Sequence, residues 1–238
     1  YRILVWLEKT SCQFADHVIA TNQSHKNVEM QRGHVPEDRI TIVRNGPTLD
    51  CLNLVKPDAC MEKKDKVVFG YIGVIGPQDG LDYLLRALQL LNTALQRDDF
   101  FCMIIGEGSA LAELKIQARQ LELLQYVSFT GFLPQADALK RLSTVDICVD
   151  PDPSNIYNDR CTMIKMMEYM ALGKPIVAFD LPEHHVSAGD AALYARPNEE
   201  LDFARQIMTL MDDYERRVKM GQIGMKRVEN ELAWSYQA

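Results

Sequence analysis

Lys165 and Glu168 stand three residues apart in the stretch NDRCTMIKMMEYMALGKPIVAFD, which runs from Asn158 to Asp180. Residues with this spacing are neighbours on the surface of a helix. A cation near a helix N-terminus suits a phosphate, and a carboxylate one turn further suits a diol because it accepts two hydrogen bonds. The pair therefore has two interpretations. It is either a site for a phosphate and a ribose, or a solvated ion pair that contributes about 0.2–0.5 kcal/mol.

The residues around this pair favour a largely buried helix. Between Thr162 and Leu172 the segment is apolar apart from the two charges and a tyrosine hydroxyl. A helix that is apolar on most sides is usually buried, and a buried charge needs a partner or a ligand. We expect Asp159 or Thr162 to cap its N-terminus. The methionines that cover the other sides are Met163, Met166, Met167 and Met170.

The elements that must position this helix are short apolar strands that alternate with helices. This alternation predicts an α/β fold with a Rossmann-like parallel sheet and helices on both faces. In such a sheet the loops after the carboxyl ends of the strands meet at one edge, where ligands bind. The expected strands are VVFGYIG, FFCMIIG, VSF, VDICVD, PIVAF and AALYA, and the clearest expected helices are residues 81–96 and 109–123.

Two glycine-containing loops follow the first two of these strands. Gly73 and Gly76 belong to GVIGPQDG, in which Asp79 or Gly80 can cap the next helix, and Gly106 begins GEG. Glycines let the backbone approach a phosphate closely, so all three are candidate ligand contacts. The match to the dinucleotide fingerprint is poor, which argues against a hydride-transfer cofactor. The GEG loop is equally well explained as a plain tight turn.

The chain divides into three parts. Residues 1–50 contain a helical segment and two short strand-like runs, HVIAT and ITIV, which predict a partial second α/β unit. Residues 51–66 are polar and include the charge run EKKDK, so we expect a linker there. Residues 67–238 form the regular strand and helix pattern. The chain opens YRILVWLEK without an initiator methionine, and we expect it to be a piece of a longer protein.

Composition excludes several classes of function. The net charge is −7 and no basic stripe interleaved with aromatics occurs, so nucleic-acid binding is not expected. The six cysteines form no CxxC, and Cys102 and Cys148 sit in apolar strands, which favours buried thiols in a reducing cytosol. No run approaches the length of a membrane span, and no spacing resembles a zinc site. His184 and His185 follow the strand PIVAFD at the same sheet edge, where either a structural role or a ligand contact is open.

Four pieces of the chain carry a resemblance to a known family. They are ADHVIATNQSHKNVEMQRG with EDRITIVRNGPTLD, VVFGYIGVIGPQDGLDYLLRAL, IIGEGSALAELKIQARQLELLQYVSFTGFLP and MMEYMALGKPIVAFDLPE. Together they resemble the retaining, nucleotide-sugar-dependent glycosyltransferases of the GT-B fold (glycosyl transferases group 1), in particular the type found in lipopolysaccharide and amino-sugar transferases. The first piece resembles the end of the N-terminal domain of that family and the start of its linker. The others resemble its C-terminal, donor-binding domain, and EYMALGKPIV is the most specific match.

The resemblance implies roles for matching positions. Glu168 matches the glutamate that binds the donor ribose. Phe132 and Leu133 match the loop whose backbone meets the base, and Gly73 and Gly76 match the loop beneath the diphosphate. The segment that reads the donor sugar and its phosphate is matched by residues 158–163, with Asp159, Thr162 and Met163 as the candidate contacts.

The sequence departs from the family pattern at the charged positions. The first glutamate of the family's pair should lie eight positions before Glu168, where Arg160 stands. An arginine and a lysine usually serve the diphosphate, but Val74 and Asp79 occupy those places. We therefore expect Lys165, with Arg160 or the helix N-terminus, to supply the positive charge that catalysis needs.

The resemblance predicts the donor-binding part of an enzyme that transfers a sugar from UDP, GDP, ADP or TDP to a lipid-linked or glycan acceptor in cell-surface polysaccharide synthesis. The fold normally works without a bound metal, so neither a metal nor a cofactor is expected. We expect a cytoplasmic protein and little turnover by this part alone. Peripheral association with the inner face of the membrane and self-association of the chain are left open. The alternatives are a non-catalytic binding or assembly module of the same fold and a sugar-nucleotide epimerase.

Overall fold

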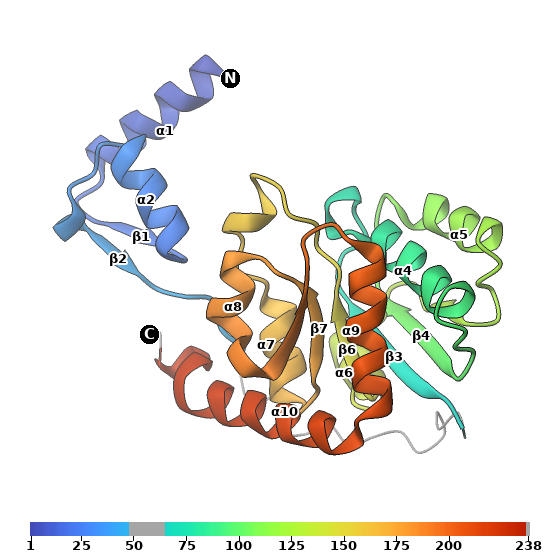
Figure 1. Cartoon of the computed structure of the whole chain (residues 1–238). Coiled ribbons are helices and arrows are strands. Elements are labelled where there is room, and N and C mark those ends of the chain that lie inside the picture. The colour runs from blue at the N-terminus through green and yellow to red at the C-terminus, as the bar shows by residue number, and fades with distance from the viewer. Residues whose placement is uncertain (48–64, 237–238) are drawn as a thin grey trace.

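The structure is a computed structural model that describes residues 1–47 and 65–236. Two α/β units are visible, a small one at the N-terminus and a large one that follows it (Figure 1). The expected linker, residues 51–66, lies outside the described residues except for its last two positions.

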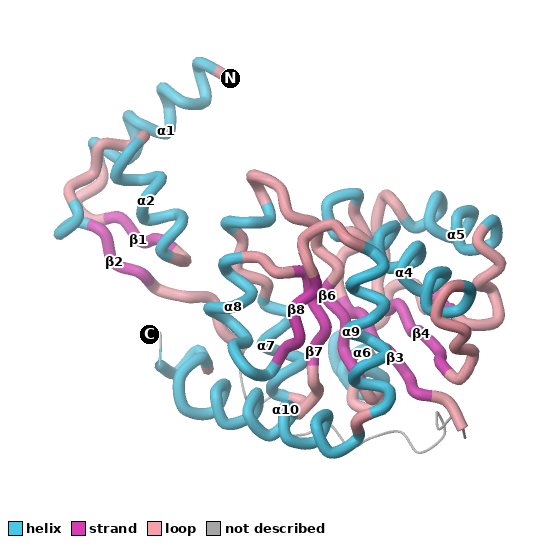
Figure 2. Tube along the Cα trace, in the orientation of Figure 1, coloured by secondary structure: helices cyan, strands magenta, loops and turns pink. Residues whose placement is uncertain are grey.

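The large unit is built on one sheet of six parallel strands. Their order is β5-β4-β3-β6-β7-β8, so the direction of winding reverses between β3 and β6. Figure 2 shows β4, β3, β6, β7 and β8 side by side, between helices. The parallel sheet expected from the sequence is confirmed. The strands are β3 (Val67–Ile72), β4 (Phe100–Ile105), β5 (Val127–Phe129), β6 (Ile147–Asp150), β7 (Ile176–Phe179) and β8 (Ala192–Ala195).

Helices cover both faces of this sheet, because alternate strand residues are apolar on each side. One buried cluster joins Phe69 and Ile104 to α4, α5 and α9, and the other joins Val68 and Met103 to α6, α7 and the end of the chain. The helices are α4 (Leu81–Thr93), α5 (Leu111–Gln120), α6 (Gln135–Leu142), α7 (Ile164–Ala171), α8 (Pro182–Ala188), α9 (Glu200–Asp212) and α10 (Tyr214–Arg227).

The small unit contains α1 (Arg2–Phe14), β1 (Val18–Ala20), α2 (Gln23–Gln31) and β2 (Ile40–Ile42). The two strands pair in parallel, and the core beneath α2 is small. Helix α1 has no buried residue and exposes several large apolar side chains. Exposed apolar patches favour association, so self-association of this chain stays a prediction.

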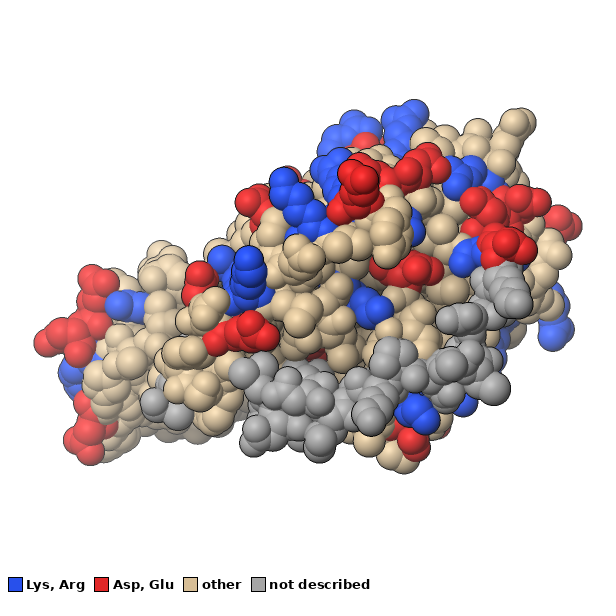
Figure 3. All heavy atoms as spheres, turned by 90° about the horizontal axis from the view of Figure 1, so that it is seen from below, with Lys and Arg blue, Asp and Glu red and all other residues tan. Residues whose placement is uncertain are grey.

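The burial of two cysteines and the distribution of surface charge match the expectations from composition. Cys102 and Cys148 are buried free thiols, as expected. Acidic and basic side chains are interspersed on the described part of the face shown in Figure 3, and they form no basic stripe there. In the described ranges, no helix combines the length and the apolarity needed to cross a membrane.

Candidate functional site

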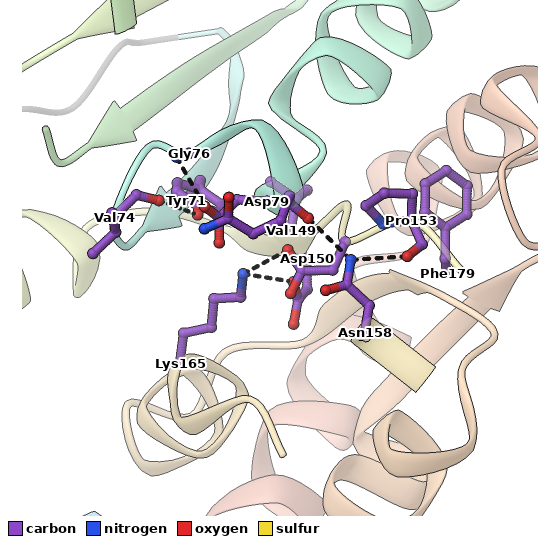
Figure 4. A network of polar contacts seen from close by, with 12 residues as sticks. Tyr71, Val74, Gly76, Asp79, Val149, Asp150, Pro153, Asn158, Lys165 and Phe179 are labelled. Atoms are coloured by element: carbon purple, nitrogen blue, oxygen red, sulfur yellow. Dashed lines mark hydrogen bonds and ion pairs between the residues drawn. The ribbon is translucent and has the colours of Figure 1, made fainter. Parts of the chain in front are cut away.

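A buried lysine marks the point where the strand order reverses. Lys165 extends from α7 toward the carboxyl ends of β3 and β6 (Figure 4). Its Nζ atom lies 3.0 Å from Oδ1 of Asp150 and 2.9 Å from Oδ1 of Asp152. The same atom lies 4.9 Å from the centre of the Tyr71 ring. Open α/β sheets bind ligands at such a switch point, so this edge is the candidate site.

The charges around Lys165 fix its protonation state. Burial lowers the pKa of Lys165, but Asp150 and Asp152 outweigh burial and hold that pKa well above its ordinary value. Burial and the neighbouring Asp150 raise the pKa of Asp152 well above the usual range of a carboxyl group. Because one ammonium serves two buried carboxylates, Lys165 stays charged while Asp152 holds a proton more tightly than a solvated carboxyl group does.

His184 lies behind these carboxylates. Its Nδ1 atom is 2.8 Å from the Phe179 carbonyl oxygen, which can only accept, so Nδ1 carries the hydrogen. Its Nε2 atom lies 3.8 Å from Oδ2 of Asp150 and has no hydrogen-bond partner among the described residues. Ligand atoms of Asp150, Asp152 and His184 lie within 4.8 Å of one another, which is close enough to hold a metal ion. The Lys165 ammonium already contacts both carboxylates, however, and supplies the cation that they require.

The glycine loops pack against each other rather than standing apart. Gly106 has a φ of +145°, and a Cβ atom there would lie 1.9 Å from the carbonyl oxygen of Gly73. The Gly76 N–H donates to Oδ2 of Asp79 at 2.9 Å, so this carboxylate lies inside the predicted phosphate loop. Gly80 takes the N-cap position of α4, as one of the two expected alternatives.

The start of α7 is not capped as the sequence predicted. Helix α7 has Met163 at its N-cap position and no side-chain cap, so the expected capping by Asp159 or Thr162 is wrong. The Thr162 hydroxyl instead donates to Oε2 of Glu183 at 3.4 Å. Oδ1 of Asp159 is buried without a hydrogen-bond partner among the described residues. The Arg160 side chain is exposed, and no contact between it and Lys165 is observed.

The predicted base loop follows β5. Phe132 is 72% exposed, and Leu133 packs against the second buried cluster. Met163 packs against the same cluster, which places the predicted base loop and the start of α7 on the same side of the sheet. Whether these residues contact a donor stays a prediction.

Glu168 is half-buried on α7, and its carboxylate has no hydrogen-bond or ion-pair partner in the part of the chain that the structure describes. Burial raises its pKa. A carboxyl group whose pKa rises on folding contributes stability at low pH and loses it as pH rises through the folded pKa. A partly desolvated carboxylate without a partner fits a ligand-binding role, because a diol could supply the missing donors.

Replacing Glu168 by Gln should therefore stabilise the chain at high pH. We expect the free energy of unfolding of Glu168→Gln to exceed that of the wild type at about pH 8 and to equal it near pH 4. Urea denaturation at both pH values measures this difference. Glu215→Gln, at an exposed position of α10, is the matched control and should show no such pH dependence. Equal stability of wild type and Glu168→Gln at pH 8 would contradict the prediction.

The sequence did not single out four residues of this region: Asp150, Asp152, Asn22 and Glu183. The two aspartates carried a usable signal, since they follow a buried strand at the expected sheet edge. Asn22 and Glu183 carried no such signal, because both contact Thr162 from far along the chain. Asn22 is 140 residues from Thr162, and Glu183 is 21 residues from it.

A doubly wound parallel sheet with polar residues gathered at its switch point defines the class of Rossmann-like domains. Within that class, a model of the family described as glycosyl transferases group 1 matches residues 66–213. The chain belongs to this family.

Known proteins support the same assignment. The chain is 28% identical over 172 residues to the amylovoran biosynthesis glycosyltransferase AmsK of Erwinia amylovora, covering 67% of this chain and 41% of AmsK. It is 24% identical over 148 residues to the 2-deoxystreptamine glucosyltransferase of Streptomyces kanamyceticus, covering 61% of this chain and 36% of that protein. The chain thus spans less than half the length of the curated relatives that it matches.

Solved structures confirm the expected GT-B type of fold. Anabaena Alr3699/HepE in complex with UDP superimposes with a TM-score of 0.80 at 19% identity, covering 98% of this chain and 64% of HepE. A mutant of TarM from S. aureus, in complex with UDP and other ligands, gives a TM-score of 0.80 at 15% identity, covering 99% of this chain and 44% of TarM.

Proposed function

We propose that this chain is the donor-binding part of a retaining glycosyltransferase that moves a sugar from a nucleoside diphosphate to a glycan or lipid-linked acceptor in cell-surface polysaccharide synthesis. Membership of the family supports transfer, and the name of the AmsK relative supports polysaccharide synthesis. UDP in two structures of the same fold supports a nucleotide-sugar donor. The proposal needs no metal or cofactor. It places the full-length protein in the cytoplasm, with peripheral contact to the inner face of the membrane.

The buried ammonium of Lys165 at the switch point is the observation that carries this proposal. Departure of the sugar leaves charge on a diphosphate, and preorganised cations and N–H donors stabilise such charge. An ammonium has three N–H donors. Oδ1 of Asp152 accepts one of them at 2.9 Å, and Oδ1 of Asp150 forms an ion pair with the same ammonium at 3.0 Å. In this proposal a remaining N–H donates to a phosphate oxygen. Arg160 is the second cation of the proposal, and Glu168 binds the ribose.

One observation favours a second function, a non-catalytic binding module. Asp79, Asp150 and Asp152 act electrostatically on the single ammonium of Lys165. Three carboxyl groups against one lysine make a poor environment for a diphosphate, because like charges repel strongly in a partly buried site. A module of this kind would recognise the nucleoside or the sugar without favouring the diphosphate.

Calorimetric titration with UDP, GDP, ADP and TDP, each beside its nucleoside, distinguishes these functions. For a transferase we expect one diphosphate to bind at least about tenfold more tightly than its nucleoside, a difference of about 1.4 kcal/mol. Arg160→Gln should reduce this preference, whereas Arg205→Gln at an exposed position of α9 should not. Equal affinity for nucleoside and diphosphate would favour the binding module. Absence of binding at millimolar concentrations would overturn both.

A further inference from the structure

Four polar residues join the small unit to the segment that precedes α7. They form what we name the Thr162 network: Asn22, Arg44, Thr162 and Glu183. Asn22 is fully buried and Glu183 is 4% exposed, although both are polar. Buried polar groups persist only when they are hydrogen-bonded, so this network has a defined geometry.

Asn22 uses both ends of its side-chain amide. Its Oδ1 atom accepts from the His25 N–H at 2.8 Å and so caps α2. Its Nδ2 atom donates to the Arg160 carbonyl oxygen at 2.7 Å and to Oγ1 of Thr162 at 3.0 Å. One side chain therefore ties the first turn of α2 to the backbone just ahead of α7.

Glu183 completes the network from α8. Its Oε2 atom accepts from Nη2 of Arg44 at 2.9 Å and from the Thr162 hydroxyl at 3.4 Å. Its Oε1 atom accepts from the Ser24 hydroxyl at 3.3 Å. The Thr162 hydroxyl has one hydrogen, so it donates to Glu183 while it accepts from Asn22. Arg44 supplies the cation that a buried carboxylate requires.

We propose that Asn22 and Glu183 are positioning residues that set the backbone of residues 160–162, and with it the start of α7, from the side of the small unit. Lys165 and Glu168 stand on that helix, so the small unit becomes part of what places them. The Thr162 hydroxyl then takes part in the contact between the small and the large unit, and it does not cap α7. The inference rests on the proposed function only in giving residues 158–163 a role in donor binding.

Alkylation of Cys161 measures the positioning directly, because this half-buried thiol lies within the segment. Asn22→Ser keeps a side chain that can cap α2 but is too short to reach Thr162. Thr162→Val removes the hydroxyl at nearly constant shape, and Thr162→Ser restores it. With iodoacetamide and peptide mass spectrometry at fixed pH, we expect Cys161 to react about tenfold faster in Asn22→Ser and Thr162→Val, a change of about 1.4 kcal/mol in local opening. Thr162→Ser should react like the wild type.

The buried thiols Cys102 and Cys148 report global unfolding in the same samples. They should stay protected while Cys161 gains reactivity. Unchanged reactivity of Cys161 in both Asn22→Ser and Thr162→Val would overturn the proposal. So would a parallel rise at Cys102 and Cys148, which would give the network a role in overall stability alone. Because alkylation needs no donor, it decides the positioning role even when calorimetry rejects the nucleoside diphosphate.

Discussion

Replacing Lys165 by Ala should lower the free energy of unfolding by about 3–5 kcal/mol at neutral pH. The variant leaves Asp150 and Asp152 without the ammonium that lies within 3.0 Å of each. Both carboxylates are at most 1% exposed, so few water molecules compensate for the lost cation. The cost arises mainly from the unpaired charges, since the side-chain contact with Tyr71 adds only about 1–2 kcal/mol.

The pH dependence of this loss has a definite sign. Burial and Asp150 already raise the pKa of Asp152 in the wild type. Without Lys165 that pKa rises further, so the folded variant keeps this proton to a higher pH than the unfolded chain does. A raised folded pKa contributes stability that is lost as pH rises. The gap between Lys165→Ala and the wild type should therefore narrow as pH falls from about 7 to about 4.

Urea denaturation followed by circular dichroism measures this effect. Adding Asp152→Asn to Lys165→Ala removes one unpaired charge and should recover part of the loss. Lys219→Ala, an exposed lysine of α10, is the control and should change stability by less than about 0.5 kcal/mol. A Lys165→Ala variant within 1 kcal/mol of the wild type would show that the two carboxylates are not dependent on this lysine.

The sequence predicted the sheet and the edge at which this site lies, but it did not identify the ion-pair partners of Lys165. Alternating apolar strands and helices were sufficient to predict the parallel sheet and its ligand edge. Helix spacing offered an ion pair with Glu168 as one of the two interpretations of Lys165, beside a phosphate and ribose site. The structure pairs Lys165 with Asp150 and Asp152, which lie 15 and 13 residues earlier. A long loop between β6 and α7 folds back over the sheet edge, and helical periodicity carries no information on such a return.

The same physical reason explains the misplaced cap. Capping preferences predicted Asp159 or Thr162 from local residue types alone. The Thr162 hydroxyl accepts from Asn22 and donates to Glu183, so it is engaged in tertiary hydrogen bonds and the helix begins without a side-chain cap. Contacts that join residues far apart in the chain carry no local signal. The contacts of Asn22 and Glu183 with Thr162 together hold the segment before α7 against the small unit.

Replacing Gly106 by Ala should destabilise the chain by at least about 3 kcal/mol. About 1–3 kcal/mol comes from holding a non-glycine residue in sparsely populated backbone conformation. The rest comes from overlap, since the new Cβ atom would lie 1.9 Å from the Gly73 carbonyl oxygen and the obstacle is backbone rather than a movable side chain. The loops after β3 and β4 would have to separate. Gly106 thus packs against Gly73 of the predicted phosphate loop and helps to hold that loop in place.

Gly131 provides the matched control, because its carbonyl oxygen accepts from the Gly106 N–H at 3.2 Å in an isolated bridge. Its φ is +73°, but a Cβ atom there would meet nothing within 4 Å. Gly131→Ala should therefore cost only the conformational part, about 1–2 kcal/mol. Denaturation midpoints of the two variants measure the difference, which isolates the contact between loops from the backbone preference. If Gly106→Ala were no less stable than Gly131→Ala, the two loops would not be in contact, and Gly106 would be free to approach a phosphate itself.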